Sequence, residues 1–239
     1  MRIFALSDFH LSFAEKPQAG GGRLLKPMSV FGEHWEDCYE RIYENCHKLL
    51  SADDWLLCAG DISWAMTPEE TENDFAFLES LPCKIIITRG NHDYWWQGIS
   101  RIRKLLPANC FALQNDALLL ENKIVVAGTR GWPLPGSADW KQHDEKILQR
   151  ESMRLRMSLQ DAARHDLPII AMLHYPPLLR AEHTPFTEIL TEFAVQHTIY
   201  GHLHGPSALS GFEGEFDGVQ YHNTAADKLE FVPRLIWED

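Results

Sequence analysis

Five short apolar segments recur along this chain, and each is followed within a few residues by a cluster of Gly, Asp, Asn or His. They have the length and the β-branched or aromatic content of strands, and they cover residues 3–6, 55–59, 85–88, 169–173 and 198–200. Helix-like segments lie between them, at residues 33–50, 68–81, 98–106, 143–164 and 185–193. Alternating strands and helices predict an α/β fold with a largely parallel sheet.

The longest of these predicted helices and the C-terminal segment add two expectations. In residues 143–164, four apolar side chains fall on one face, as a helix packed on a sheet requires: Leu148, Leu155, Leu159 and Ala162. Beyond about residue 207, glycines separate two strand-like segments, 219–222 and 229–236. We expect these to be antiparallel strands that finish a second sheet. The length of 239 residues and the 45% apolar content predict a single domain over residues 1–239.

The charge balance and the apolar runs restrict the partners. The formal net charge of -12 disfavours a partner held mainly by contacts to a nucleic-acid backbone. Uncharged apolar runs reach about eight residues, far short of the roughly 20 needed to cross a bilayer, so no membrane partner is expected. The first residues show no signal-peptide pattern, and five cysteines without paired spacing favour reduced, structural thiols. These features predict a cytoplasmic protein.

The polar clusters share one position in the predicted sheet. Open α/β sheets bind ligands outside the carboxyl ends of their strands, where the loops converge, and all five clusters lie there. Together they supply two carboxylates, one amide oxygen and four imidazoles, from Asp8, Asp61, Asn91, His10, His174, His202 and His204. Oxygen and nitrogen donors without a thiolate suit Mn, Fe, Zn or Ni. The pattern therefore predicts a metal site at the carboxyl ends of the strands.

Seven ligands exceed what one ion takes from a protein, whereas two ions bridged by a carboxylate use them all. Such a pair, about 3.5–4 Å apart, holds both the attacking and the leaving oxygen of a phosphoryl transfer. Two divalent ions, two aspartates and a hydroxide leave the site with a charge of roughly +1, which favours an anionic substrate. Each motif has an ordinary alternative when taken alone: residues 90–93 as a turn, for example, or His202 and His204 as surface polar residues. Their occurrence together, in order, favours the metal site.

The series Asp-x-His, Gly-Asp, Gly-Asn-His-Asp, His and Gly-His-x-His resembles the signature of the calcineurin-like metallophosphoesterase superfamily. It is complete here between residues 8 and 204. The resemblance implies a two-sheet sandwich flanked by helices and two divalent ions, manganese being the favoured metal. It further implies the two ligand sets, in which Asp61 bridges: Asp8, His10, Asp61 and His204 for one ion, and Asp61, Asn91, His174 and His202 for the other.

His92 lies outside both ligand sets, and the resemblance implies that it stands near the phosphate. A protonated imidazole there would stabilise developing charge and donate a proton to the leaving oxygen. Asp93 is a second catalytic candidate, because a carboxylate partner raises a histidine pKa. Its alternative role is to stabilise the turn.

Departures from the pattern bear on the substrate. Protein serine/threonine phosphatases of the superfamily carry Gly-Asp-x-Val-Asp-Arg-Gly, but this chain has Ile-Ser-Trp-Ala-Met after Asp61. Lipid A pathway pyrophosphatases show Gly-Asn-Arg-Asp, with Arg in place of His92. SbcD-like nucleases share Gly-Asn-His-Asp but carry additional DNA-contacting domains, and the charge of -12 disfavours them. The remaining group is the small bacterial-type phosphoesterases, which act on diverse substrates.

Three further features are candidates for substrate contact. Trp95 follows the catalytic motif and is a candidate for stacking on a base or sugar, with core packing as its alternative. Arg130 follows an apolar run at 124–127 and is a candidate clamp for a phosphate oxygen, with a surface ion pair as its alternative. The glycine-rich segment 15–26 is either a mobile loop at the rim of the site or a surface loop without a role.

The sequence thus predicts an enzyme that hydrolyses a phosphomonoester or phosphodiester. A metal-bridging hydroxide attacks phosphorus, and His92 donates a proton to the leaving group. The substrate is expected to be a small phosphorylated molecule, a nucleotide being one candidate. The rival hypotheses are a catalytically silent scaffold, like the retromer subunit that resembles the superfamily, and a nucleotide-binding sensor. The sequence indicates neither the native metals nor the oligomeric state.

Overall fold

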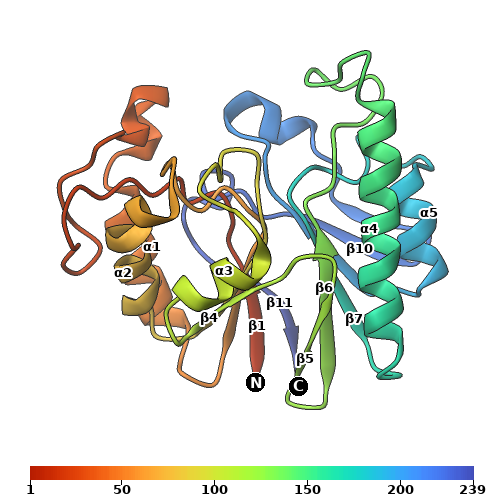
Figure 1. The fold of residues 1–239 in the computed structure, drawn as a ribbon, viewed down its shortest axis with the longest axis horizontal. Coiled ribbons are helices and arrows are strands. Elements are labelled where there is room, and N and C mark those ends of the chain that lie inside the picture. Colours follow the sequence, from red (N-terminus) through yellow and green to blue (C-terminus); the bar gives the residue numbers. More distant parts are fainter. The chain divides into compact units, whose positions relative to one another are not determined.

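The computed structural model describes residues 1–239 and shows two compact units, each with its own sheet and hydrophobic core. The first unit comprises Met1–Ala112 with Ala226–Asp239, and the second comprises Leu113–Ala225. Both sheets are mixed, and helices flank each of them (Figure 1). The predicted α/β class and the presence of two sheets are confirmed. That residues 1–239 form a single domain stays a prediction.

The sheet of the first unit has the order β11-β1-β2-β3-β4. Its strands are β1 (Arg2–Ala5), β2 (Trp55–Cys58), β3 (Lys84–Ile87), β4 (Cys110–Ala112) and β11 (Arg234–Glu238). β1 to β4 are parallel, and β11 runs antiparallel to β1, so both chain ends lie side by side in this unit (Figure 1). Its helices are α1 (Cys38–Leu49), α2 (Glu72–Ser80) and α3 (Ile99–Leu105), with 3-10 turns η1 (Met28–Phe31), η2 (Glu33–Trp35) and η3 (Pro68–Thr71).

The second unit has the strand order β5-β6-β7-β8-β10-β9. The strands are β5 (Ala117–Leu120), β6 (Ile124–Thr129), β7 (Ile169–Leu173), β8 (His197–Tyr200), β9 (Gly214–Phe216) and β10 (Val219–Asn223). β6, β7, β8 and β10 are parallel to their neighbours in this series, and the two edge strands are antiparallel. The helical elements are α4 (Glu145–Ala163), α5 (Pro185–Glu192) and the 3-10 helix η4 (Gly205–Ser210).

Helix α4 packs on this sheet through the face that the sequence predicted. Leu148, Leu155, Leu159 and Ala162 are all buried in the core of the second unit. α5 lies beside α4, as Figure 1 shows. α4 is the longest helix and is polar on its other face, and no helix of the protein is both long and apolar enough to cross a membrane.

One predicted helix boundary and one predicted strand arrangement are wrong. The helix expected from residue 33 begins only at Cys38, because the extended Glu36 (ψ 139°) and the left-handed Asp37 (φ 52°) separate it from the short turn η2. The C-terminal segments do not both finish the second sheet as antiparallel strands, since β10 runs parallel to β8 and β11 joins the first sheet. The chain turns at Glu230 and Phe231, both with positive φ, and the Phe231 ring packs 5.2 Å from Trp35 in the first core.

The glycine-rich segment 15–26 folds back on itself as a short hairpin-like loop. Gln18 and Gly21 exchange backbone hydrogen bonds of 2.8 and 2.9 Å, and the Ala14 amide donates to the Arg23 carbonyl over 2.8 Å. Gly20 has a φ of 81°, and a Cβ there would come within 2.7 Å of the Tyr39 carbonyl oxygen of α1. The glycine therefore permits the close approach of this loop to α1.

Asp54 ties the start of β1 to the turn before β2. Its buried carboxylate accepts hydrogen bonds from the backbone and guanidinium of Arg2, and from the backbone and hydroxyl of Ser51, over 2.6–3.2 Å. Burial alone would raise the pKa of Asp54, but the hydrogen bonds from Arg2 and Ser51 outweigh it and lower the pKa to about 2.

A carboxyl group whose pKa is lowered by folding stabilises the protein at pH values above its pKa in the unfolded chain. This contribution is lost as the pH falls through its pKa in the folded protein. We therefore expect Asp54→Asn to lower the free energy of unfolding by about 2 kcal/mol at pH 6, with about half of that deficit gone at pH 3. Urea denaturation between pH 3 and pH 6 measures the difference in the free energy of unfolding, and Asp53→Asn at the neighbouring exposed position is the control. A deficit that is the same at both pH values would contradict the assignment.

Candidate metal centre

Three predicted ligands of the first unit lie close together in its loops. Asp8 and His10 follow β1, and Asp61 follows β2. All three side chains are buried, and His10 Nε2 lies 3.8 Å from Asp61 Oδ2. Asp8 offers a carboxylate oxygen within 4.8 Å of a potential ligand atom on each of the other two residues. Two carboxylates and an imidazole therefore meet in a buried place.

Backbone hydrogen bonds hold the loops after β1 and β2 alongside each other. The Asp8 amide donates to the Gly60 carbonyl over 3.1 Å, and the His10 amide donates to the Asp61 carbonyl over 2.9 Å. Asp8, His10 and Asp61 all have left-handed backbone, with φ of 62°, 52° and 51°. Residues other than glycine adopt this conformation infrequently, and strained backbone clusters at functional sites. The local conformation therefore agrees with a functional role for these loops.

The loop after β3, which carries Asn91 and His92, is fixed by the fully buried Asp93. The Asp93 carboxylate accepts hydrogen bonds of 2.7–3.2 Å from the backbone amides of Gly90, Asp61, Ile62 and Ser63, and from Trp95 Nε1. Burial raises the pKa of Asp93 to about 6, against the opposing effect of these donors. The His92 ring is not among its partners, so the geometry matches the turn-stabilising alternative for Asp93.

Gly90 brings this loop into contact with Asp61. A Cβ at Gly90 would lie 2.0 Å from Asp61 Oδ1 and 2.3 Å from the Asp61 amide nitrogen, so no larger residue fits. The His92 amide donates to Asp61 Oδ1 over 2.8 Å. The glycine and the amide together orient the predicted bridging carboxylate.

Trp64 packs against two histidines of the first unit, whereas Trp95 lies in the core. The Trp64 ring stacks on His10 at a centroid distance of 4.9 Å and lies 4.4 Å from the His92 ring. Trp95 is fully buried, packs against Phe75 and donates to Asp93. A fully buried ring presents no face on which a base or sugar could stack, so its surroundings agree with the core-packing alternative.

The second unit holds the other predicted ligands. His174 follows β7, and His202 and His204 follow β8. The His174 amide donates to the Arg130 carbonyl over 3.0 Å, and the rings of His174 and His202 are 5.1 Å apart. His202 also has left-handed backbone, with a φ of 70°. The structure therefore gathers imidazoles at the ends of these neighbouring strands.

Asp139 is a contact of this histidine group that the sequence did not predict. Its Oδ2 atom lies 2.8 Å from His202 Nε2. A carboxylate on one ring nitrogen orients the imidazole and leaves the other nitrogen, Nδ1, for a ligand. Asp139 stands in an irregular loop without a motif, so no sequence signal identifies it.

Arg130 occupies the predicted strand end, after β6. Its guanidinium lies over the Trp132 ring at 4.5 Å, and its carbonyl also accepts a hydrogen bond from the Tyr175 amide over 3.1 Å. Its backbone thus positions the loop that carries His174. A contact between its side chain and a phosphate stays a prediction.

The donors in each unit suit divalent ions. In the first unit, two buried carboxylates within 4.8 Å of each other repel when both are ionised, and a cation bound between them removes that repulsion. Imidazole nitrogens and carboxylate oxygens are donors that borderline divalent metals accept. All five cysteines are buried free thiols, and none belongs to the predicted ligand set. The residues therefore fit the metals that the sequence predicted.

Comparisons with solved structures show similarity over nearly the whole chain. One is described as a protein of unknown function, AQ665, from Aquifex aeolicus. It is 15% identical, with 98% of this chain and 95% of that chain covered and a TM-score of 0.48. A second crystal structure is 10% identical, with 94% and 90% covered and a TM-score of 0.56, which supports the fold. A comparison with curated proteins found no match.

A family comparison covers most of the chain. Residues 1–206 match the calcineurin-like phosphoesterase family. The matched segment includes the predicted metal-ligand motifs from Asp8 to His204, as well as His92. This chain therefore belongs to the calcineurin-like phosphoesterase family.

Proposed function

We propose that this protein is a metal-dependent phosphoesterase that hydrolyses a small phosphomonoester or phosphodiester. The observation that carries the proposal is the buried group of Asp8, His10 and Asp61, which lies at strand ends within the family match. The match includes all the predicted ligands, which supports the proposal of a dinuclear centre.

The ligand sets follow the superfamily pattern. Asp8, His10, Asp61 and His204 would hold one ion, and Asp61, Asn91, His174 and His202 the other, with manganese as the favoured metal. Divalent ions bound there polarise the phosphoryl group and lower the pKa of water from 15.7 to about 7. The chain itself orients the bridging carboxylate through Gly90 and the His92 amide.

His92 is the proposed proton donor. Its ring lies beside Trp64 and 5.6 Å from the His10 ring, so the side chain is held next to a predicted ligand. An imidazole in this place, when protonated, stabilises negative charge on the phosphoryl oxygens and transfers a proton to the leaving oxygen.

The experiment that tests the function compares wild type, His92→Ala and His165→Ala, the last an exposed histidine in the second unit. Each protein is stripped of metal, reconstituted with Mn²⁺ and assayed on chromogenic monoesters and diesters. Wild type and His165→Ala are expected to hydrolyse either the monoesters or the diesters. We expect this activity to require bound metal. His92→Ala is expected to lose roughly 10²- to 10⁴-fold in kcat while keeping its bound metal.

Metal content, measured by elemental analysis, separates loss of proton transfer from loss of the ions. Metal-loaded wild type that binds phosphoesters without turning any of them over would overturn the enzyme assignment and favour a scaffold or sensor. Full activity of His92→Ala would remove His92 from the mechanism while leaving the phosphoesterase in place.

A further inference from the structure

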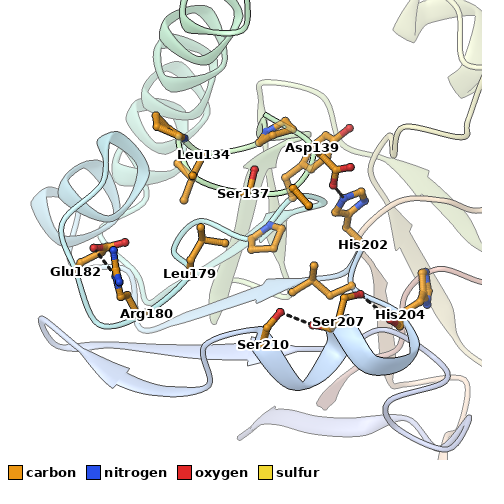
Figure 2. Close-up of a pocket in the computed structure, with 17 residues that line it drawn as sticks. Leu134, Ser137, Asp139, Leu179, Arg180, Glu182, His202, His204, Ser207 and Ser210 are labelled. Carbon is orange, nitrogen blue, oxygen red and sulfur yellow. Dashed lines mark hydrogen bonds and ion pairs between the residues drawn. The ribbon is translucent and has the colours of Figure 1, made fainter. Parts of the chain in front are cut away.

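A cavity of about 660 Å³ opens beside His202 and His204 within the second unit (Figure 2). Three chain segments line it: the irregular loop after β6, the loop between β7 and α5, and the segment from His202 into η4. Its volume falls in the range of small-molecule sites, which is about 300–1,000 Å³. The cavity is therefore large enough for an organic group of nucleoside size.

Apolar side chains form much of the lining. Leu134 and Leu179 point toward each other from two of these loops, as Figure 2 shows, and Tyr175, Pro176 and Leu203 add further apolar surface. Leu134 is buried in the core of the second unit, and the half-buried Leu179 packs against that core. A ligand that enters gains chiefly because its own apolar surface, together with that of the half-buried Leu179 and Leu203, is removed from water.

The charged groups of the cavity disfavour a second anionic group on the ligand. Its one basic residue outside the histidines, Arg180, is ion-paired with Glu182 at 2.8 Å, and the carboxylate of Asp139 contacts His202. A polyphosphate or carboxylate in this space would meet two carboxylates and a cation that is already paired. An uncharged group meets no such repulsion.

One residue of the wall carries a hydroxyl without a partner. Ser137 Oγ is buried and has no hydrogen-bond partner. A buried hydroxyl without a partner is uncommon in folded proteins, and a ligand that offers a donor or acceptor satisfies it. Few polar contacts in a mostly apolar wall are typical of sites that orient an organic ligand.

We propose that this cavity binds the uncharged organic group of the phosphoester substrate. The proposal rests on the proposed function, because His202 and His204 are predicted ligands of the metals that would hold the phosphoryl group. The substrate is thereby a phosphoester of an uncharged alcohol of nucleoside size, and the cavity determines specificity for this organic group.

The test uses two diesters with the same leaving group, the p-nitrophenyl esters of methyl phosphate and of thymidine 5′-phosphate. In wild type, we expect kcat/KM for the thymidine ester to exceed that for the methyl ester by roughly 10- to 100-fold. Ala138 is exposed and lines the cavity, so Ala138→Trp fills it without disturbing the core. In this variant, we expect the ratio of the two kcat/KM values to fall to about one. The control Ala163→Trp, at an exposed site on α4, is expected to keep the wild-type ratio.

A wild-type ratio near one, or a ratio unchanged in Ala138→Trp, would overturn the proposal. If neither diester is hydrolysed, binding of free thymidine, measured by saturation-transfer NMR, decides the matter without turnover. Binding that is present in wild type and Ala163→Trp but lost in Ala138→Trp supports the cavity even where the phosphoesterase assignment fails. Equal signals in all three proteins, or none in wild type, would refute it.

Discussion

Asp61→Asn is expected to lower kcat/KM for the preferred phosphoester by roughly 10³-fold, about 4 kcal/mol of transition-state stabilisation. Asparagine keeps an oxygen that accepts the His92 amide, at present a 2.8 Å hydrogen bond to Asp61 Oδ1. It removes the negative charge and the second carboxylate oxygen that a bridging ligand provides. The loss therefore arises at the metals and not in the loop. Steady-state kinetics on Mn²⁺-loaded protein measures it.

The matched control is Asp53→Asn, which makes the same chemical change at an exposed site in the same unit. We expect the control to keep wild-type kinetics. Asp61→Asn should retain the wild-type circular dichroism spectrum but bind less than two equivalents of metal. Wild-type turnover by a correctly folded Asp61→Asn protein would exclude this carboxylate as a bridging ligand.

Asp93→Ala has the largest expected effect on stability, about 3–5 kcal/mol lost from the free energy of unfolding. The change removes the acceptor for four buried backbone amides and the Trp95 indole. Each buried donor left without a partner costs about 1–3 kcal/mol, and water entering the gap recovers part of the total. Urea denaturation monitored by tryptophan fluorescence measures the loss.

Asp93→Asn provides a graded comparison, because its single carbonyl oxygen replaces one of two acceptors. It should fall between wild type and Asp93→Ala, and it gives a measurement if the alanine variant does not fold. Asp53→Ala controls for the loss of an exposed aspartate. A loss below 1 kcal/mol for Asp93→Ala would show that the loops after β2 and β3 do not depend on this carboxylate.

The sequence predicted the strands that carry the ligands because their signals are local. β1, β2, β3, β7 and β8 lie within a residue of the apolar runs, and each polar cluster follows its strand. The strands β4 and β9 were missed, since three residues give too short a pattern. The placement of β11 depends on pairing with β1, more than 200 residues away, and no local pattern records that partner.

The site shows the same division between local and distant information. The ligand types stand in short motifs, whereas the contact of Asp139 with His202 joins residues 63 positions apart. The cavity likewise requires three separate loops to meet, which composition and spacing do not reveal. For Asp93, the motif left two roles open, and the five donors around it match the turn-stabilising role.

Four predicted metal ligands, Asp8, His10, Asp61 and His202, have left-handed backbone, which opposes thermal stability to the proposed metal binding. Glycine adopts this conformation without the steric cost that a Cβ incurs, so glycine at these positions would relieve strain in the metal-free protein. It would also delete four predicted ligand groups. Laboratory evolution for thermal tolerance in a chelating buffer would therefore enrich glycine at these positions and erase the centre, whereas the same selection with divalent ions present would retain the ligands.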